Sequence, residues 1–112
     1  MAHADDVVRV FFDQIAERYD EENYIEGPAR PAAGAQLLLR LTAALDGLPR
    51  GEWADLGCGT GRALRVLGER GHRVIGIECS SQMLKRAREN ATGEGIKLEE
   101  AEATAWLQAR AG

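Results

Sequence analysis

The order of structural elements is decided by a glycine-rich stretch in the middle of the chain, Asp55-Leu56-Gly57-Cys58-Gly59-Thr60-Gly61. A short apolar run at residues 53–56 leads into it and predicts a strand, while Ala63, Leu64 and Leu67 follow it at helical spacing. Glycine permits a sharp turn and lets a ligand approach the main chain, because it has no Cβ atom. The stretch therefore predicts a strand that turns directly into a helix, with room for a ligand at the turn.

Two more strands and two more helices are predicted downstream of this turn. Residues 73–78 form the strongest strand pattern, since they are branched, apolar and short, and residues 96–99 alternate as a strand does. Ser80 or Ser81 is a candidate N-cap for the helix between them, and residues 104–110 can begin another helix. Strands that alternate with helices predict a parallel sheet with right-handed crossovers.

Upstream of the turn, apolar residues recur at helical spacing in two segments, 7–19 and 37–48. A loop with two prolines and a glycine, residues 27–31, separates them. We therefore expect two N-terminal helices ahead of the sheet. The chain divides into a helical leader, residues 1–50, and a partial α/β domain, residues 51–112.

The composition is that of an ordinary globular chain with an acidic balance. With 112 residues and a formal net charge of −4, it has the size of one domain and is a poor electrostatic match for bare nucleic acid. No segment approaches the roughly 18 uninterrupted apolar residues of a membrane span, and the acidic N-terminus does not resemble a signal peptide. Two cysteines do not make a disulfide framework. We expect a cytoplasmic protein with reduced thiols, and neither a nucleic acid nor a membrane as its partner.

An acidic residue, Glu78, ends the second predicted strand and follows Gly57 by 21 residues. In doubly wound sheets an acid at about this distance from a glycine turn reaches the hydroxyl pair of a ribose. Its two oxygens suit two adjacent hydroxyl donors. Alone, the glycines fit an ordinary tight turn and the acid fits a solvated strand end. Together they predict a ligand that contains a nucleoside.

The spacing argues against a dinucleotide as this ligand. The dinucleotide fingerprint, G-x-G-x-x-G/A, requires a small residue at position 62, where helix and strand pack closely, and the chain has Arg62. The phosphate-binding ending Gly-Lys-Ser/Thr does not follow the glycines either. Neither histidine has ligand spacing with Cys58 or Cys79, so we expect no metal.

Four segments resemble class I S-adenosylmethionine-dependent methyltransferases. Residues 55–62 are very similar to the first motif of this family, and Glu78-Cys79-Ser80-Ser81-Gln82-Met83-Leu84 is similar to its second motif. Residues 13–20 resemble the leader helix that many small-molecule methyltransferases carry, and Glu102-Ala103 lies where the family usually has Asp-Ala. The resemblance implies a Rossmann-like three-layer α/β sandwich with a parallel sheet, of which this chain has strands 1–3 only.

The resemblance also implies which residues hold the methionine and ribose parts of S-adenosylmethionine. The glycine stretch would border both parts. Asp55 would help hold the amino group, Glu78 would accept the ribose hydroxyls, and Tyr19 would close over the methionine end.

The adenine would be held by residues from the second and third strands. Cys79 and Met83 would pack on its ring, and Glu102 with the Ala103 amide would address its edge. The cofactor-binding residues that the resemblance implies are Tyr19, Asp55, Gly57, Cys58, Gly59, Gly61, Glu78, Cys79, Met83, Glu102 and Ala103.

Three functional interpretations follow. The first is a methyltransferase that acts on a small molecule and is truncated here to its cofactor-binding half. In the family, the strands after the third contribute the acceptor pocket, so the sequence does not identify catalytic residues. A non-catalytic S-adenosylmethionine-binding or regulatory module is the alternative. A nicotinamide-dependent oxidoreductase fragment is the third interpretation, which Arg62 disfavours.

The missing strands also predict an open sheet edge. In the family the first strand lies between the second and the fourth, so residues 53–56 would have one unpaired side. An unpaired edge is a template for pairing with another chain. We therefore expect the chain to dimerise, to aggregate, or to fold its N-terminal helices over the gap.

Overall fold

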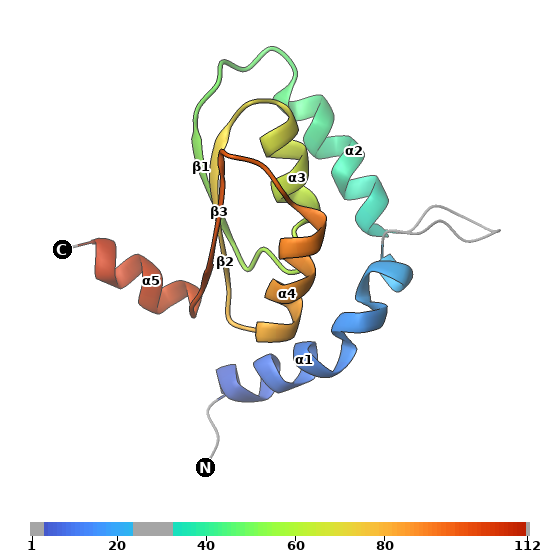
Figure 1. Ribbon diagram of the computed structural model, residues 1–112, viewed down its shortest axis with the longest axis vertical. Coiled ribbons are helices and arrows are strands. Elements are labelled where there is room, and N and C mark those ends of the chain that lie inside the picture. The colour runs from blue at the N-terminus through green and yellow to red at the C-terminus, as the bar shows by residue number, and fades with distance from the viewer. Residues whose placement is uncertain (1–3, 24–32, 112) are drawn as a thin grey trace.

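The computed structural model describes residues 4–23 and 33–111 of the chain. The helices are α1 (Ala4–Asn23), α2 (Ala33–Leu45), α3 (Arg62–Glu69), α4 (Ser81–Asn90) and α5 (Ala103–Arg110), and the strands are β1 (Glu52–Leu56), β2 (Arg73–Glu78) and β3 (Ile96–Glu100) (Figure 1). Two helices precede an alternation of strands and helices, which confirms the predicted order. The predicted loop at residues 27–31 lies outside the described residues.

The three strands form one parallel sheet in the order β1-β2-β3. In its register, Trp53 lies opposite Val74, and Val74 lies opposite Ile96. This arrangement confirms the predicted parallel α/β sheet. Within residues 4–23 and 33–111, β1 has a partner strand on one side only, so the predicted open edge is present there.

The hydrophobic core lies between the sheet and the helices α3 and α4. Leu64 of α3 and Leu84 and Ala87 of α4 are fully buried, and Val74 of β2 faces them. The spacing of these residues explains the helices, because positions three and four apart lie on one helical face. The helix α2 packs beside α3 and closes the core at Leu45.

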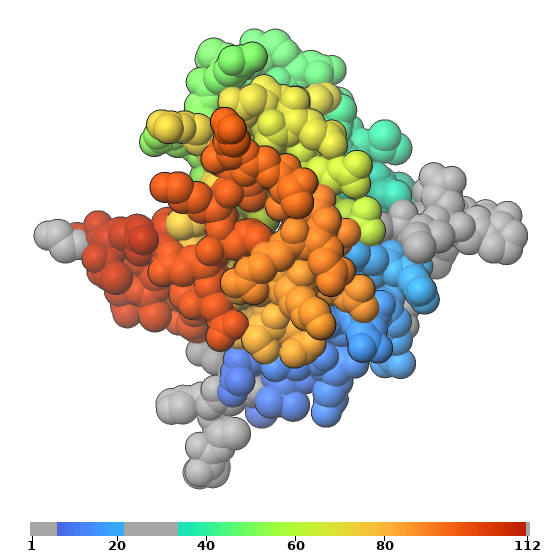
Figure 2. Space-filling view, in the orientation of Figure 1, coloured from blue at the N-terminus to red at the C-terminus, as the bar shows by residue number. Residues whose placement is uncertain are grey.

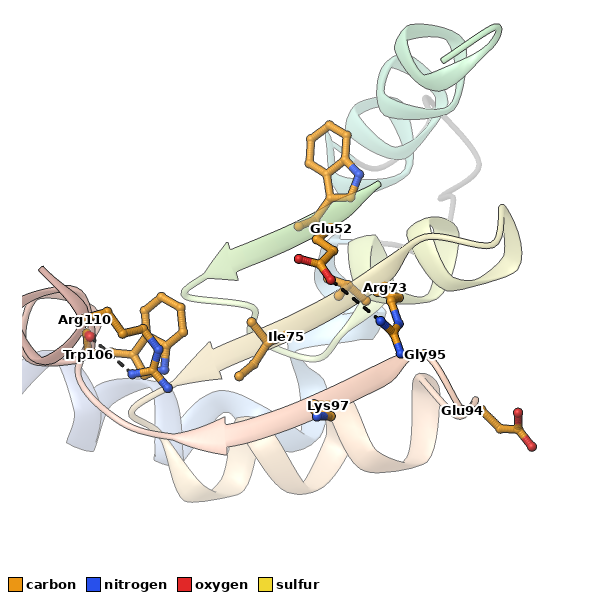
Figure 3. A pocket seen from close by; sticks show the side chains of 10 residues that line it. Glu52, Arg73, Ile75, Glu94, Gly95, Lys97, Trp106 and Arg110 are labelled. Atoms are coloured by element: carbon orange, nitrogen blue, oxygen red, sulfur yellow. Dashed lines mark hydrogen bonds and ion pairs between the residues drawn. The ribbon is translucent and has the colours of Figure 1, made fainter. Parts of the chain in front are cut away.

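The opposite face of the sheet carries a shallow hollow of about 420 Å³ (Figure 3). Ile75 and Lys97 lie on its floor, and Trp106 and Arg110 of α5 border it, with the Arg110 guanidinium stacked 3.9 Å from the centre of the Trp106 ring. The helix α5 extends away from the sheet (Figure 1). Of the described helices, α5 alone borders this face of the sheet, so it is the only part of the predicted third layer that the structure describes.

The helix α1 packs against α4, and both space-filling and ribbon views show the two side by side (Figures 1 and 2). Ala16, near the middle of α1, is buried. Among the described elements, α1 packs against α4 and α2 against α3, while Trp53 and Leu56 of β1 stay exposed. Of the three outcomes expected for the open edge, the fold of the N-terminal helices over it is therefore not the arrangement of the described residues. The physical reason is that α1 finds hydrogen-bond partners on α4 and on the glycine turn, as described below. Self-association stays a prediction.

None of the described helices has the length and apolar content that crossing a membrane requires.

The buried His72 ties the starts of β1 and β2 together. Its Nδ1 accepts hydrogen bonds from the Gly51 N–H at 3.0 Å and from the Trp53 indole N–H at 3.1 Å. The two rings meet edge-on, with centroids 5.6 Å apart. Because one imidazole nitrogen accepts both bonds, the proton of the neutral ring lies on Nε2.

Replacing His72 with alanine is expected to lower the free energy of unfolding by about 2 kcal/mol, because two N–H groups lose their acceptor and a cavity opens. Urea denaturation measures this change. Arg73→Ala is the control, since Arg73 is exposed and its 3.7 Å ion pair with Glu52 lies at the surface. If the two variants unfold at the same urea concentration, His72 does not have this role.

Candidate functional site

The glycine turn adopts a backbone shape that favours glycine at three positions. The φ angles of Gly57, Gly59 and Gly61 are +73°, +56° and +81°. Side chains with a Cβ atom rarely adopt these angles, whereas glycine does so without steric cost. The N–H groups of Gly57 and Cys58 both donate to the Ile77 carbonyl, at 2.8 and 2.9 Å, so the turn is attached to the end of β2.

The outer glycines of the turn have different surroundings. A Cβ atom added to Gly57 would meet nothing within 4 Å, whereas one added to Gly61 would lie 3.0 Å from both Cα and Cβ of Ala87 in α4. Gly57 therefore leaves open space beside the turn, where a ligand can approach the backbone. Gly61 instead allows α4 to pack closely against the turn.

The carboxylate of Glu78 lies directly beside the turn and is buried. Its Oε1 accepts the Gly59 N–H at 2.9 Å, and its Oε2 accepts the Ser80 N–H at 2.8 Å. These two bonds fix the carboxylate in one orientation. Each carboxylate oxygen can accept more than one hydrogen bond, so both retain capacity for further donors.

A hollow of about 130 Å³ opens at the carboxyl ends of the strands. It brings together five of the residues that sequence reasoning selected, and these are Gly57, Glu78, Cys79, Glu102 and Ala103. Val8 of α1, Ile77 of β2 and Ala101 also line it, and none of the three was selected from the sequence. Val8 lies in the apolar pattern of the first predicted helix, which indicates a buried face but not which element that face meets.

Two selected residues lie on the core side of the turn. Met83 of α4 is buried and lies beside Gly59. A Cβ atom added to Gly59 would be 3.9 Å from the methyl group of Met83. Cys58 belongs to the hydrophobic core cluster. Burial, together with the charges of Asp55 and Glu78, raises the pKa of the Cys58 thiol to about 12, so this thiol stays neutral. Neither residue is among those that line the hollow.

Two further selected residues, Asp55 and Tyr19, lie close enough to Glu78 to sense its charge. Burial and the charge of Glu78 raise the pKa of Asp55. Burial and the charges of Asp20 and Glu78 raise the pKa of Tyr19, which reaches this region from α1. The site therefore has a negative potential, which favours a cationic group on a ligand.

Glu102 is the N-cap of α5. Its carboxylate accepts the N–H groups of Thr104 and Ala105, at 2.9 and 2.8 Å. These backbone hydrogen bonds hold the pKa of Glu102 below its usual range. The carboxylate thus stabilises the start of α5 at the rim of the hollow.

Asp20 of α1 joins three segments around the glycine turn. Its carboxylate accepts hydrogen bonds from the Thr60 hydroxyl, from the Arg62 guanidinium at 3.1 Å and from the Asn90 amide at 2.9 Å. Burial by itself raises the pKa of Asp20, but these hydrogen bonds and the charge of Arg62 outweigh it and hold the pKa below its ordinary value of 3.8. The stability that Asp20 contributes is therefore present above about pH 4 and is lost as the pH falls through the lower folded-state pKa.

Asp13 makes a second connection from α1, to the start of α4. Its Oδ1 accepts the Ser80 hydroxyl and the Gln82 N–H at 3.2 Å. The Ser80 hydroxyl oxygen in turn accepts the Met83 N–H at 3.1 Å, so Ser80 rather than Ser81 is the N-cap of α4. Sequence reasoning placed Asp13 and Asp20 in the leader helix without selecting them. Their spacing of seven residues was the available signal, because it puts both on one helical face.

These features define a class of protein. A parallel sheet with a glycine turn after β1 and a buried acid at the end of β2 is the arrangement of a Rossmann-like domain that binds a nucleoside-containing ligand. Among residues 4–23 and 33–111, no group of three histidine, cysteine or acidic side chains is placed to hold a metal ion.

The chain belongs to the methyltransferase domain family. The family model described as "Methyltransferase domain" matches residues 54–111, just over half of the chain. The tRNA 5-carboxymethoxyuridine methyltransferase of Escherichia coli K12 is 36% identical over 87 residues, which are 76% of this chain and 33% of that protein. The chain thus spans about a third of the length of this relative.

Solved structures show the same fold. The complex of DhpI with S-adenosylhomocysteine superposes with a TM-score of 0.63 at 25% identity and covers 83% of this chain and 42% of DhpI. Magnesium protoporphyrin IX methyltransferase from Synechocystis PCC 6803, with S-adenosylmethionine bound, has a TM-score of 0.73 at 21% identity and covers 91% and 56% of the two chains. These findings confirm the Rossmann-like fold and the methyltransferase resemblance.

The comparisons also correct one expectation. We expected that nucleic acid is not a partner, but the relative from Escherichia coli is a tRNA methyltransferase. The expectation rested on the net charge of −4. A net charge averages over the whole surface, whereas RNA is bound by local features of that surface, so the average does not exclude an RNA partner.

Proposed function

We propose that the chain binds S-adenosylmethionine at the carboxyl ends of β1 and β2, as the cofactor-binding part of a methyltransferase. The observation that carries this proposal is the hollow in which the open side of Gly57 lies beside the fixed carboxylate of Glu78. A backbone without a Cβ and a buried acceptor side by side suit a ribose with two hydroxyl groups.

The proposed roles follow from charge and position. Glu78 accepts the ribose hydroxyls with the acceptor capacity that Gly59 and Ser80 leave. Asp55 attracts the amino group of the methionine part, because both its own charge and that of Glu78 favour a cation there. Tyr19 borders the same end from α1. The bound cofactor supplies an electrophilic methyl group on a positively charged sulfur.

The adenine has its proposed place further along the carboxyl edge of the sheet. Cys79 and Ala103 line the hollow on that side, and Glu102 is the N-cap of α5. Met83 supports the turn from below, and Cys58, Gly59 and Gly61 shape its backbone. These are the cofactor-binding residues that we propose.

For the methyl acceptor we propose a small molecule, because the leader residues 13–20 resemble those of small-molecule methyltransferases. RNA is the second candidate, which the tRNA methyltransferase from Escherichia coli favours. Transfer of a labelled methyl group to tRNA, measured beside transfer to a metabolite extract, separates the two acceptors.

The proposal also includes the division of the chain into domains and the location of the protein in the cell. We assign residues 1–50 to a helical leader and residues 51–112 to the cofactor-binding domain. Cys58 and Cys79 are both free thiols, which suits the reducing cytoplasm that we propose as the location.

Titration calorimetry with S-adenosylhomocysteine and with NAD tests the choice of cofactor. We expect S-adenosylhomocysteine to bind at least about tenfold more tightly, because Arg62 occupies the position where a dinucleotide needs a small residue. NAD affinity that equals or exceeds that for S-adenosylhomocysteine would contradict the proposed function.

A further inference from the structure

Both backbone segments that hold the Glu78 carboxylate are themselves held by α1. The first segment is the glycine turn, where Gly59 donates to Glu78 and its neighbour Thr60 donates its hydroxyl to Asp20. The second is the start of α4, where Ser80 donates its N–H to Glu78 and its hydroxyl to Asp13. Asp20 is therefore linked to the Glu78 carboxylate through the glycine turn, and Asp13 is linked to it through the start of α4.

The two aspartates act from one face of one helix. They are seven residues apart, which is close to two helical turns, so both project towards the same neighbours. Asp20 is 17% exposed and Arg62, its ion-pair partner, is 27% exposed. An ion pair with this little solvent is screened less than one at the surface. Asn90 bridges Asp20 and the Thr60 carbonyl, with both distances at 2.9 Å, which connects the end of α4 to the same cluster.

The turn needs such an external constraint. Three of its residues are glycines with positive φ, and glycine loses more conformational freedom on folding than any other residue. Thr60 and Arg62 bond to Asp20 and are not among the residues that line the hollow, so their contacts restrain the turn without occupying the ligand space. Arg62 is the residue that departs from the dinucleotide fingerprint, and its guanidinium donates a hydrogen bond to Asp20.

We propose that Asp13 and Asp20 are positioning residues, through which the docking of α1 holds the glycine turn and the start of α4 in the shape that orients Glu78 for the cofactor. This inference rests on the proposed function. It implies that docking of α1 and binding of the cofactor stabilise each other, because both depend on the same arrangement of Gly59 and Ser80 around Glu78.

The variant Asp20→Asn tests the proposal with little change in size. An asparagine has one acceptor oxygen and no charge for Arg62, so it does not satisfy Thr60, Arg62 and Asn90 together. We expect the amide hydrogens of Gly59 and Gly61 to exchange roughly tenfold faster in the free protein. We expect the dissociation constant of S-adenosylhomocysteine to rise about tenfold. Amide hydrogen exchange and titration calorimetry measure the two effects.

Two controls separate positioning from general stability. Glu17→Gln removes the same charge from the exposed face of α1 and is expected to change neither measurement. His72→Ala lowers stability at the opposite end of the strands and is expected to leave the affinity for S-adenosylhomocysteine unchanged. A loss of affinity in Asp20→Asn but not in His72→Ala is therefore specific to the contacts that α1 makes with the glycine turn and with α4.

A conservative pair at Thr60 gives a second test, which also serves if Asp20→Asn does not fold. Thr60→Ser keeps the hydroxyl and is expected to retain the affinity, whereas Thr60→Val removes the hydroxyl at the same size and is expected to lose about as much affinity as Asp20→Asn.

The outcomes are distinguishable. If the unaltered protein does not bind S-adenosylhomocysteine, the proposed function fails, and hydrogen exchange alone decides whether Asp20 positions the turn. If the unaltered protein binds and Asp20→Asn and Thr60→Val bind equally well, the positioning role is overturned and the proposed function stands. Unchanged exchange at Gly59 and Gly61 also overturns it.

Discussion

Replacing Glu78 with alanine is expected to weaken the binding of S-adenosylhomocysteine by roughly tenfold to a hundredfold, the effect of losing hydrogen bonds to a charged group. It is also expected to lower the free energy of unfolding by about 3 kcal/mol, because the N–H groups of Gly59 and Ser80 lose their buried acceptor. Titration calorimetry and urea denaturation measure the two losses.

The matched control for this variant is Glu89→Ala in α4. Glu89 is 53% exposed, and its partner is Arg86 at the surface, 3.3 Å away. Surface ion pairs of this kind contribute little to stability, so this variant should behave as the unaltered protein does. If Glu78→Ala and Glu89→Ala bind and unfold alike, Glu78 does not hold the ribose.

Replacing Gly61 with alanine is expected to lower the free energy of unfolding by about 3 kcal/mol. The angle φ of +81° is strained for any residue with a Cβ, which costs roughly 1 kcal/mol. The new methyl group would also lie 3.0 Å from the Cα of Ala87, and a backbone atom in the core does not move away cheaply. Overpacking of this kind costs about 1–3 kcal/mol.

Gly57→Ala separates the two uses of glycine in the turn. Its φ of +73° carries a similar strain, but its Cβ would meet no atom within 4 Å. We expect a loss of about 1 kcal/mol in stability, together with a strong loss of S-adenosylhomocysteine binding, because the methyl group enters the space beside Glu78. Equal stability of the Gly57 and Gly61 variants in thermal unfolding would show that α4 does not constrain the turn.

The sequence predicts the order of elements because the signals are local. Apolar spacing and glycines mark each strand and helix within a few residues, and the structure confirms their order. The spacing between Gly57 and Glu78 also has a local cause, since one strand, one helix and a turn of fixed length bring both to the same edge. The hollow that contains both residues was therefore predictable.

The contacts of α1 could not be predicted in this way. Asp20 is 40 residues from Thr60 and 70 from Asn90 along the chain, and nothing in the spacing of polar residues indicates which of them will meet. The same limit applies to Cys58 and Met83. An apolar side chain beside a glycine turn can face the ligand or the core, and only the packing of α4 decides between them.

The contrasting surroundings of the two cysteines give this protein an intrinsic site for chemical labelling. Alkylating reagents attack the thiolate, and a thiol with a pKa of about 12, such as Cys58, is ionised to only about one part in ten thousand at pH 8. Burial and the charge of Glu78 raise the pKa of the Cys79 thiol as well, but Cys79 is partly exposed and lines the hollow, whereas Cys58 is buried. A maleimide should therefore react at Cys79 first, and a ligand in the hollow should slow this reaction, so the rate of labelling reports the occupancy of the hollow without an introduced cysteine.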